Sequence, residues 1–125
     1  MVRTAMVAIR EHPIVGVGAG NFPLEMLRQR SRTPQYVHNV PLLLASEIGM
    51  LGGLIWTAAW LVGIGALVRR RRHLTPDGVA ALAAWFAIGI IALFDCYPWS
   101  LQAGRLLTVL TLALVDRARI TAVHG

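Results

Sequence analysis

An almost unbroken apolar run from Val40 to Val68, ended by four consecutive arginines at 69–72, constrains this chain more than any other feature. A helix of roughly 20 residues crosses the hydrocarbon core of a bilayer, so the run exceeds what one span requires. Further apolar runs follow at about 74–94 and 101–115. These runs predict an all-α integral membrane fold with two to three transmembrane helices, the third run being either a tilted span or a re-entrant segment.

The composition agrees with a membrane class. Only 14% of the 125 residues are charged, whereas soluble domains carry about 25%. The formal net charge is +6, and all 12 basic residues are arginines. Because they gather at the ends of apolar runs, a role at the membrane edge is favoured over nucleic-acid binding. A single cysteine, Cys96, excludes an intrachain disulfide.

The first 39 residues are predicted to lie outside the membrane, before the membrane segment at 40–125. Residues 1–12 have the apolar spacing of a short amphipathic helix, which Pro13 ends. A glycine-rich loop follows, and its backbone amides could approach an anion. Without a βαβ unit it is no dinucleotide fingerprint, and a structural loop is the favoured interpretation.

The arginines also predict an orientation. The short loop containing residues 69–72 should be cytoplasmic, which places 1–39 and the break at 95–100 on the outer side. Arg28, Arg30 and Arg32 then lie where positive charge is disfavoured. Their guanidinium groups match phosphate oxygens, so we expect them to bind an anionic ligand. A basic face touching anionic lipid headgroups is the alternative.

His38 and Asn39 stand at the predicted outer foot of the long apolar run. A neutral imidazole can accept a proton from a hydroxyl near physiological pH, and Asn39 can cap a helix. Taken alone, the pair also fits a solvated loop histidine. No second His or Cys lies near enough in sequence to suggest a metal site.

Charged residues within or beside the apolar runs need partners. Glu47 either pairs with an arginine or holds a helix in place. Arg105 needs a carboxylate or room to snorkel. Asp95 can orient His38 or form a structural ion pair, and Cys96 is expected to be a small buried residue rather than a nucleophile.

Small residues at positions 45, 49 and 53 recur at i, i+4 and i+8. On one helix they would form a flat stripe of the kind that lets membrane helices pack closely.

Three segments, in order, resemble the O-antigen ligase family. One is the glycine-rich segment His12–Phe22, the second is His38-Asn39 with Glu47-x-Gly49-x-x-Gly52, and the third is Asp95-x-Tyr97-x-Trp99-x-x-Gln102-x-Gly104-Arg105. The second is similar to the most diagnostic motif of that family. Together the segments cover most of residues 10–106.

The resemblance implies a polytopic glycosyltransferase of the bacterial inner membrane, with the His38 side periplasmic. Such an enzyme moves a glycan from undecaprenyl pyrophosphate to an acceptor hydroxyl in lipopolysaccharide or surface polysaccharide biosynthesis, without a cofactor or a metal. It implies His38 as the catalytic residue and arginines as holders of the pyrophosphate. By position we assign that second role to Arg28, Arg30 and Arg32. The supporting candidates are Asn39, Glu47, Asp95 and Arg105.

Ligases, O-antigen polymerases and protein O-oligosaccharyltransferases share these motifs, so the acceptor, whether a glycan or lipid A-core, stays open. Family members have many more spans, and we therefore expect a C-terminal portion of a larger fold that works with the missing N-terminal half. The alternatives are a small non-catalytic membrane protein that packs on partner helices through the small-residue stripe, a remnant without activity, or a transporter fragment.

Overall fold

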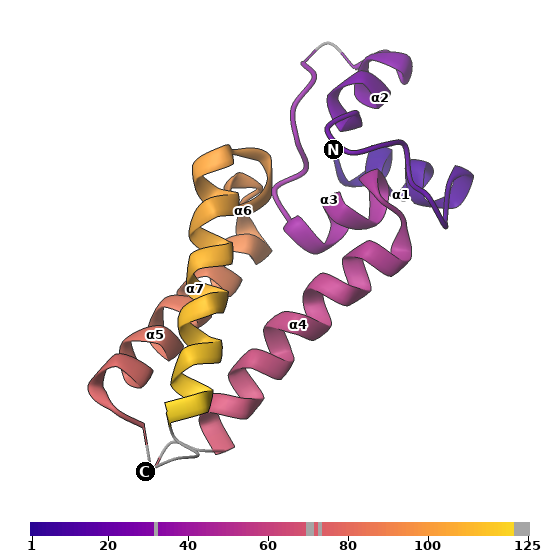
Figure 1. Cartoon of the computed structure of the whole chain (residues 1–125). Coiled ribbons are helices and arrows are strands. Elements are labelled where there is room, and N and C mark those ends of the chain that lie inside the picture. The colour runs from indigo at the N-terminus through magenta and orange to yellow at the C-terminus, as the bar shows by residue number, and fades with distance from the viewer. Residues whose placement is uncertain (32, 70–71, 73, 122–125) are drawn as a thin grey trace.

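The computed structural model describes residues 1–31, 33–69, 72 and 74–121, without the side chains of 116 and 118–121. Throughout these ranges the regular structure is helical, with no strand (Figure 1). The helices are α1 (Val2–Glu11), α2 (Phe22–Arg28), α3 (Val40–Glu47), α4 (Met50–Arg69), α5 (Pro76–Phe94), α6 (Tyr97–Ser100) and α7 (Gln102–Thr121).

Two helices, α4 and α5, are long and apolar enough to cross a membrane, with mean hydropathies of 1.9 and 2.0. Thr75 caps α5, its hydroxyl accepting a hydrogen bond from the Gly78 amide at 3.2 Å. The third predicted run forms α7, but only its part from Gln102 to Val115 is apolar, which is shorter than a span. The fold therefore supplies two candidate spans and one shorter apolar helix.

The single helix predicted over 40–68 is in fact two helices, which meet at Ile48 and Gly49. Gly49 has φ of +89°, a left-handed conformation that side chains disfavour. The Met50 amide, the first of α4, donates to the Pro13 carbonyl at 2.9 Å. A Cβ on Gly49 would collide with the Ile14 carbonyl oxygen. The chain breaks here because the N-terminal loop packs directly against the junction.

The predicted small-residue stripe on one helix therefore does not form. Gly49 lies between the helices, while Gly53 of α4 faces α3, with its Cβ position 2.8 Å from the Pro41 carbonyl oxygen and 3.0 Å from the Ala45 Cβ. The small residues serve the packing of α3 against α4 within the chain.

The glycine-rich loop docks on the end of α3. The Val17 amide donates to the Ser46 carbonyl at 2.9 Å, and the Gly18 amide donates to the Glu47 carbonyl at 2.8 Å. Carbonyls in the last turn of a helix lack hydrogen-bond donors within the helix, and the loop amides serve as their donors here. These contacts give the loop a structural role.

Helices α4 and α5 are joined by a reciprocal pair of tryptophans. The Trp60 indole donates to the Trp85 carbonyl at 3.2 Å, and the Trp85 indole donates to the Trp60 carbonyl at 3.1 Å. Each ring lies over a glycine of the opposite helix, Trp60 on Gly89 and Trp85 on Gly63. Small residues let the backbones approach closely enough for both bonds.

Figure 1 shows α5 and α7 side by side, with α1, α2 and α3 gathered near the N-terminal end of α4. One buried cluster joins the N-terminal helices to the turn after α5 through Ala5, Phe22, Met26, Val37, Leu43 and Cys96. A second joins α3 to α5 through Val40, Leu44 and Ala92. The start of α3 is thereby held against the end of α5.

Candidate functional site

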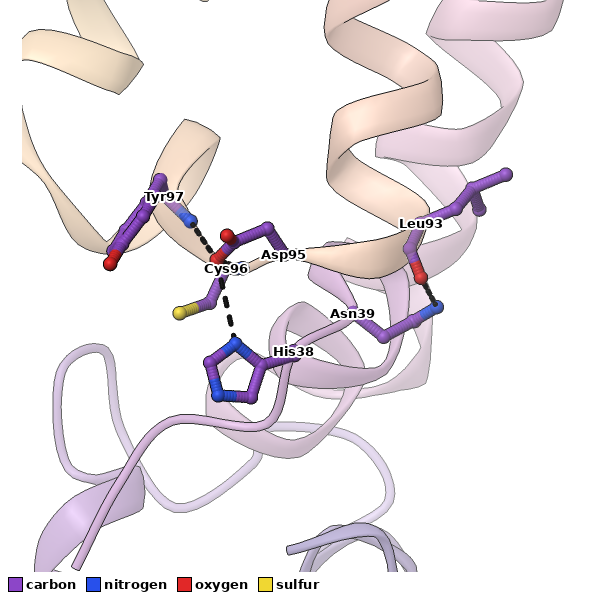
Figure 2. Close-up of polar contacts among 6 residues, drawn as sticks. All are labelled: His38, Asn39, Leu93, Asp95, Cys96 and Tyr97. Atoms are coloured by element: carbon purple, nitrogen blue, oxygen red, sulfur yellow. Dashed lines mark hydrogen bonds and ion pairs between the residues drawn. The ribbon is translucent and has the colours of Figure 1, made fainter.

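The site forms where the first residues of α3 meet the last residues of α5 (Figure 2). The Asn39 side-chain oxygen accepts from the Leu42 amide at 2.9 Å and caps α3, as the sequence predicts. Its Nδ2 donates to the Leu93 carbonyl at 3.0 Å, in the last turn of α5. One amide side chain thus satisfies a helix start and a helix end and fixes their relative position.

His38 and Asp95 meet beside this junction. The His38 Nδ1 lies 3.5 Å from the Asp95 Oδ1, and the two side chains are 49% and 32% exposed. Figure 2 shows the imidazole directed at the carboxylate. The separation is long for a hydrogen bond, although such contacts in substrate-free sites are often long and tighten on binding. Water and a dissolved ligand can reach the pair.

The Asp95 carboxylate is held by the backbone that follows it. Its Oδ1 accepts from the amides of Cys96 at 2.6 Å and Tyr97 at 3.3 Å. Partial burial raises the pKa of Asp95, but these amide hydrogen bonds and the contact with His38 outweigh that effect and leave the pKa below its ordinary value. The Asp95 carboxylate can accept a hydrogen bond from His38 Nδ1 in the ring tautomer that carries its proton there, and Nε2 is the acceptor nitrogen of that tautomer.

Cys96 completes the cluster from the buried side. It is 5% exposed. Burial raises the pKa of its thiol, the Ser100 hydroxyl acts in the opposite direction, and the Asp95 charge raises it further. A protonated thiol is a poor nucleophile, which agrees with the expectation of a buried structural cysteine. One ligand atom from each of His38, Asp95 and Cys96 falls within 4.8 Å of the others.

Glu47 lies apart from this cluster and is 1% exposed. Its Oε1 accepts from the Phe22 amide at 3.4 Å, and its Oε2 accepts from the Trp99 indole at 3.2 Å. Of the two predicted roles, the described contacts fit the one in which Glu47 holds helices in place, because it connects α2, α3 and α6.

Arg105 and Glu47 line the same small polar pocket, of about 160 Å³. The other lining residues are Ala19, Gly20, Tyr36, Trp99 and Ser100. Arg105 is exposed, and across the residues that the structure describes no ion pair joins it to Glu47. The carboxylate expected as a partner of Arg105 is therefore Glu47, which lines the same pocket without forming an ion pair with it.

Of the three arginines assigned to the pyrophosphate, the two that the structure describes, Arg28 and Arg30, are not assembled around His38. Arg28 pairs with Glu25 at 3.5 Å, and its side chain is 69% exposed. Arg30 is exposed and has φ of +60°. Neither makes a polar contact with His38 or Asp95 among the described residues, and Arg32 lies outside them.

Sequence reasoning missed two features. Glu25 is buried, with its carboxylate bonded to Gln29 at 2.9 Å as well as to Arg28; the i, i+3 and i, i+4 spacings on a short helix were the available signal. The convergence of Cys96 with His38 had no such signal, because 58 positions separate them and only the packing of α3 on α5 brings them together.

No family model, curated protein or solved structure matches this chain. Over the residues that the structure describes, the fold alone defines a broad class, an all-helical protein with two helices long and apolar enough to cross a membrane.

Proposed function

We propose that this chain is the acceptor-side, C-terminal portion of a membrane glycosyltransferase of the O-antigen ligase type, with His38 as the general base. The observation that carries the proposal is the His38–Asp95 contact, formed between residues that resemble two separate motifs of that family. The ordered Asn39 bridge beside it supports a built site over a loop histidine that is merely solvated.

In the proposed reaction the His38 Nε2 removes the proton of an acceptor hydroxyl, and the hydroxyl oxygen attacks the anomeric carbon of the donor sugar. The bond from that carbon to the pyrophosphate oxygen breaks as the new glycosidic bond forms. The lipid pyrophosphate leaves with the electron pair. Asp95 holds the Nδ1 proton and stabilises the imidazolium that forms, in the manner of a base oriented by a third group.

Arginines would bind the anionic leaving group. Arg28 and Arg30 are exposed and keep that proposed role by residue type, as does Arg32. Arg105 is an additional candidate because it is exposed at the edge of a polar pocket. Glu47 and Asn39 would act as positioning residues, because their hydrogen bonds tie helices together.

The proposal places α4 and α5 across a bacterial inner membrane. The connection between them carries Arg69 and Arg72 at its described positions, and short basic loops favour the cytoplasmic side. His38 lies at the opposite end of both helices and would face the periplasm. The donor would be a glycan on undecaprenyl pyrophosphate.

The test is made in the source bacterium, where any partner chain is present. His38→Gln should lower glycan transfer at least about 100-fold, the lower range for a lost general base, and lipid-linked glycan should accumulate as surface glycan falls. Asp95→Asn keeps the side-chain shape but loses the charge and should lower transfer less.

Asp77→Asn is the matched control, because Asp77 lies in the first turn of α5, at the end opposite to Asp95. It should leave transfer unchanged. Normal transfer by His38→Gln at an equal amount of membrane protein would sink the proposal.

A further inference from the structure

The convergence of an imidazole, a carboxylate and a thiol in one place calls for its own explanation. His38 arrives from the chain before α3, and Asp95 and Cys96 come from the turn after α5. Their ligand atoms all lie within 4.8 Å of one another. Cys96 is nine-tenths buried or more and belongs to the apolar cluster around Phe22 and Leu43, and its sulfur still lies within this distance of the His38 and Asp95 ligand atoms.

We propose that His38, Asp95 and Cys96 form a binding site for one divalent ion of the zinc type. Bond lengths to zinc are about 2.0–2.1 Å for nitrogen and oxygen and about 2.3 Å for sulfur, so two ligands of a tetrahedral ion lie roughly 3.3–3.6 Å apart. The His38 Nδ1 and the Asp95 Oδ1 already stand 3.5 Å apart. The Cys96 sulfur lies within 4.8 Å of the other two ligand atoms, so it would move closer to them when an ion binds.

The donor set selects the class of ion. Magnesium and calcium prefer all-oxygen sites, whereas a mixture of nitrogen, oxygen and sulfur suits zinc and related ions. When the ion binds, the Cys96 S–H bond breaks, a sulfur–metal bond forms, and the proton passes to water. One thiolate, one carboxylate and a neutral imidazole then balance the two positive charges.

The surroundings fit a site that an ion enters from water. The His38 and Asp95 side chains are partly exposed, while Cys96 closes the inner side. Three protein ligands leave a fourth position open to solvent, as in zinc sites that bind a further ligand. Backbone amides of Cys96 and Tyr97 orient the Asp95 carboxylate through one oxygen, which is the kind of outer support that metal ligands need.

The ion and the proposed general base exclude each other at His38. An ion on Nδ1 forces the proton of the neutral ring onto Nε2, so a loaded site cannot accept a proton there. Ion binding does not require the proposed glycosyl transfer. The two proposals are therefore alternative states of one cluster and can fail separately.

The experiment adds Co²⁺ to the purified, tag-free full chain in detergent and records its absorption spectrum. The expected result is one ion per chain, with visible bands of a tetrahedral site and a thiolate-to-cobalt charge-transfer band, all lost when Zn²⁺ displaces the cobalt. Cys96→Ser should remove the charge-transfer band and weaken binding at least tenfold. His38→Gln and Asp95→Asn should each weaken binding at least tenfold but keep the band at saturating cobalt.

His12→Gln and Asp77→Asn are the matched controls, since both residues are exposed and lie outside the cluster. They should bind cobalt as the unaltered chain does. Saturation without a charge-transfer band, or equal affinity in Cys96→Ser, would overturn the site.

A second measurement guards against misfolded variants. Zn²⁺ should slow the alkylation of Cys96 in the unaltered chain and in Asp77→Asn, and no slowing in either would count against the site. If His38→Gln abolishes glycan transfer while the unaltered chain binds no cobalt, the metal proposal fails and the general base stands. If the unaltered chain binds cobalt as expected but His38→Gln transfers glycan normally, the general-base proposal fails and the metal site stands.

Discussion

Glu47 shows how one charged side chain can organise several helices. Its carboxylate lies in the interior, where an isolated charge would be very costly, and both of its oxygens accept hydrogen bonds from N–H groups of other elements. In the described part of the chain no buried side-chain nitrogen or oxygen lacks a partner. Glu47 therefore sets the positions of the start of α2 and of Trp99 relative to α3.

Glu47→Ala should lower the free energy of unfolding by about 2–4 kcal/mol, because the Phe22 amide and the Trp99 indole lose their acceptor. Glu47→Gln keeps one acceptor oxygen and should cost less. Glu11→Ala, at an exposed residue of α1, should change stability by under about 0.5 kcal/mol. Denaturant titration in detergent, followed by circular dichroism, measures all three, and a Glu47→Ala chain as stable as the Glu11→Ala chain would contradict this role.

At the scale of elements, the junction of α3 and α4 decides the shape of the N-terminal half. Gly49 permits the chain to change direction sharply between α3 and α4. The loop before α2 packs against this junction through backbone hydrogen bonds. The apolar composition of 40–68 continues straight across this junction. The break is therefore set by backbone geometry and by the approach of a distant loop.

Gly49→Ala should destabilise the chain by about 1–3 kcal/mol or more, because alanine is strained at this φ and its Cβ meets the Ile14 carbonyl. Gly65→Ala is the control within α4, since a Cβ there meets nothing within 4 Å. It should be neutral or stabilising by up to about 1 kcal/mol, as expected for alanine in a helix. Equal thermal stability of the two variants would refute the explanation of the break.

At the scale of the whole molecule, the candidate site and the α4–α5 connection occupy opposite ends of α5. Asp95 follows the last residue of α5, and Asp77 lies in its first turn. If α4 and α5 both cross the membrane, the two ends face different compartments.

The orientation can be measured with a thiol reagent that does not cross membranes. In a Cys96→Ser background, Thr33→Cys should react in bacteria with a permeabilised outer membrane and an intact inner membrane. Asp77→Cys should react only after the inner membrane is broken. Both positions are exposed, so access to the side chain does not limit the reaction. The opposite pattern would reverse the proposed topology and place His38 in the cytoplasm.

The sequence predicts the features that depend on neighbouring residues. Apolar length and the arginines at 69–72 locate α5 and the end of α4, and the Asn39 cap follows from its place before an apolar helix. A pairing of Asp95 with His38 was one of two expected roles, because both residues stand at the ends of helices on the same predicted side.

The features that sequence reasoning could not decide depend on residues distant in sequence. The break at Gly49 requires the position of Ile14, and the choice between the two predicted roles of Glu47 requires the position of Trp99, 52 residues away. Neither periodicity nor composition records such contacts. The helix predicted over 101–115 is longer in the structure, because α7 continues past its apolar part to Thr121.

The reciprocal tryptophans of α4 and α5 limit how these helices can move. Sliding one helix past the other by a single turn, about 5.4 Å, would break both indole hydrogen bonds and drive each ring off its glycine and into a larger side chain. Intermediate offsets satisfy neither bond. The pair formed by α4 and α5 therefore has one favoured register, and we expect the two helices to move together as one rigid unit.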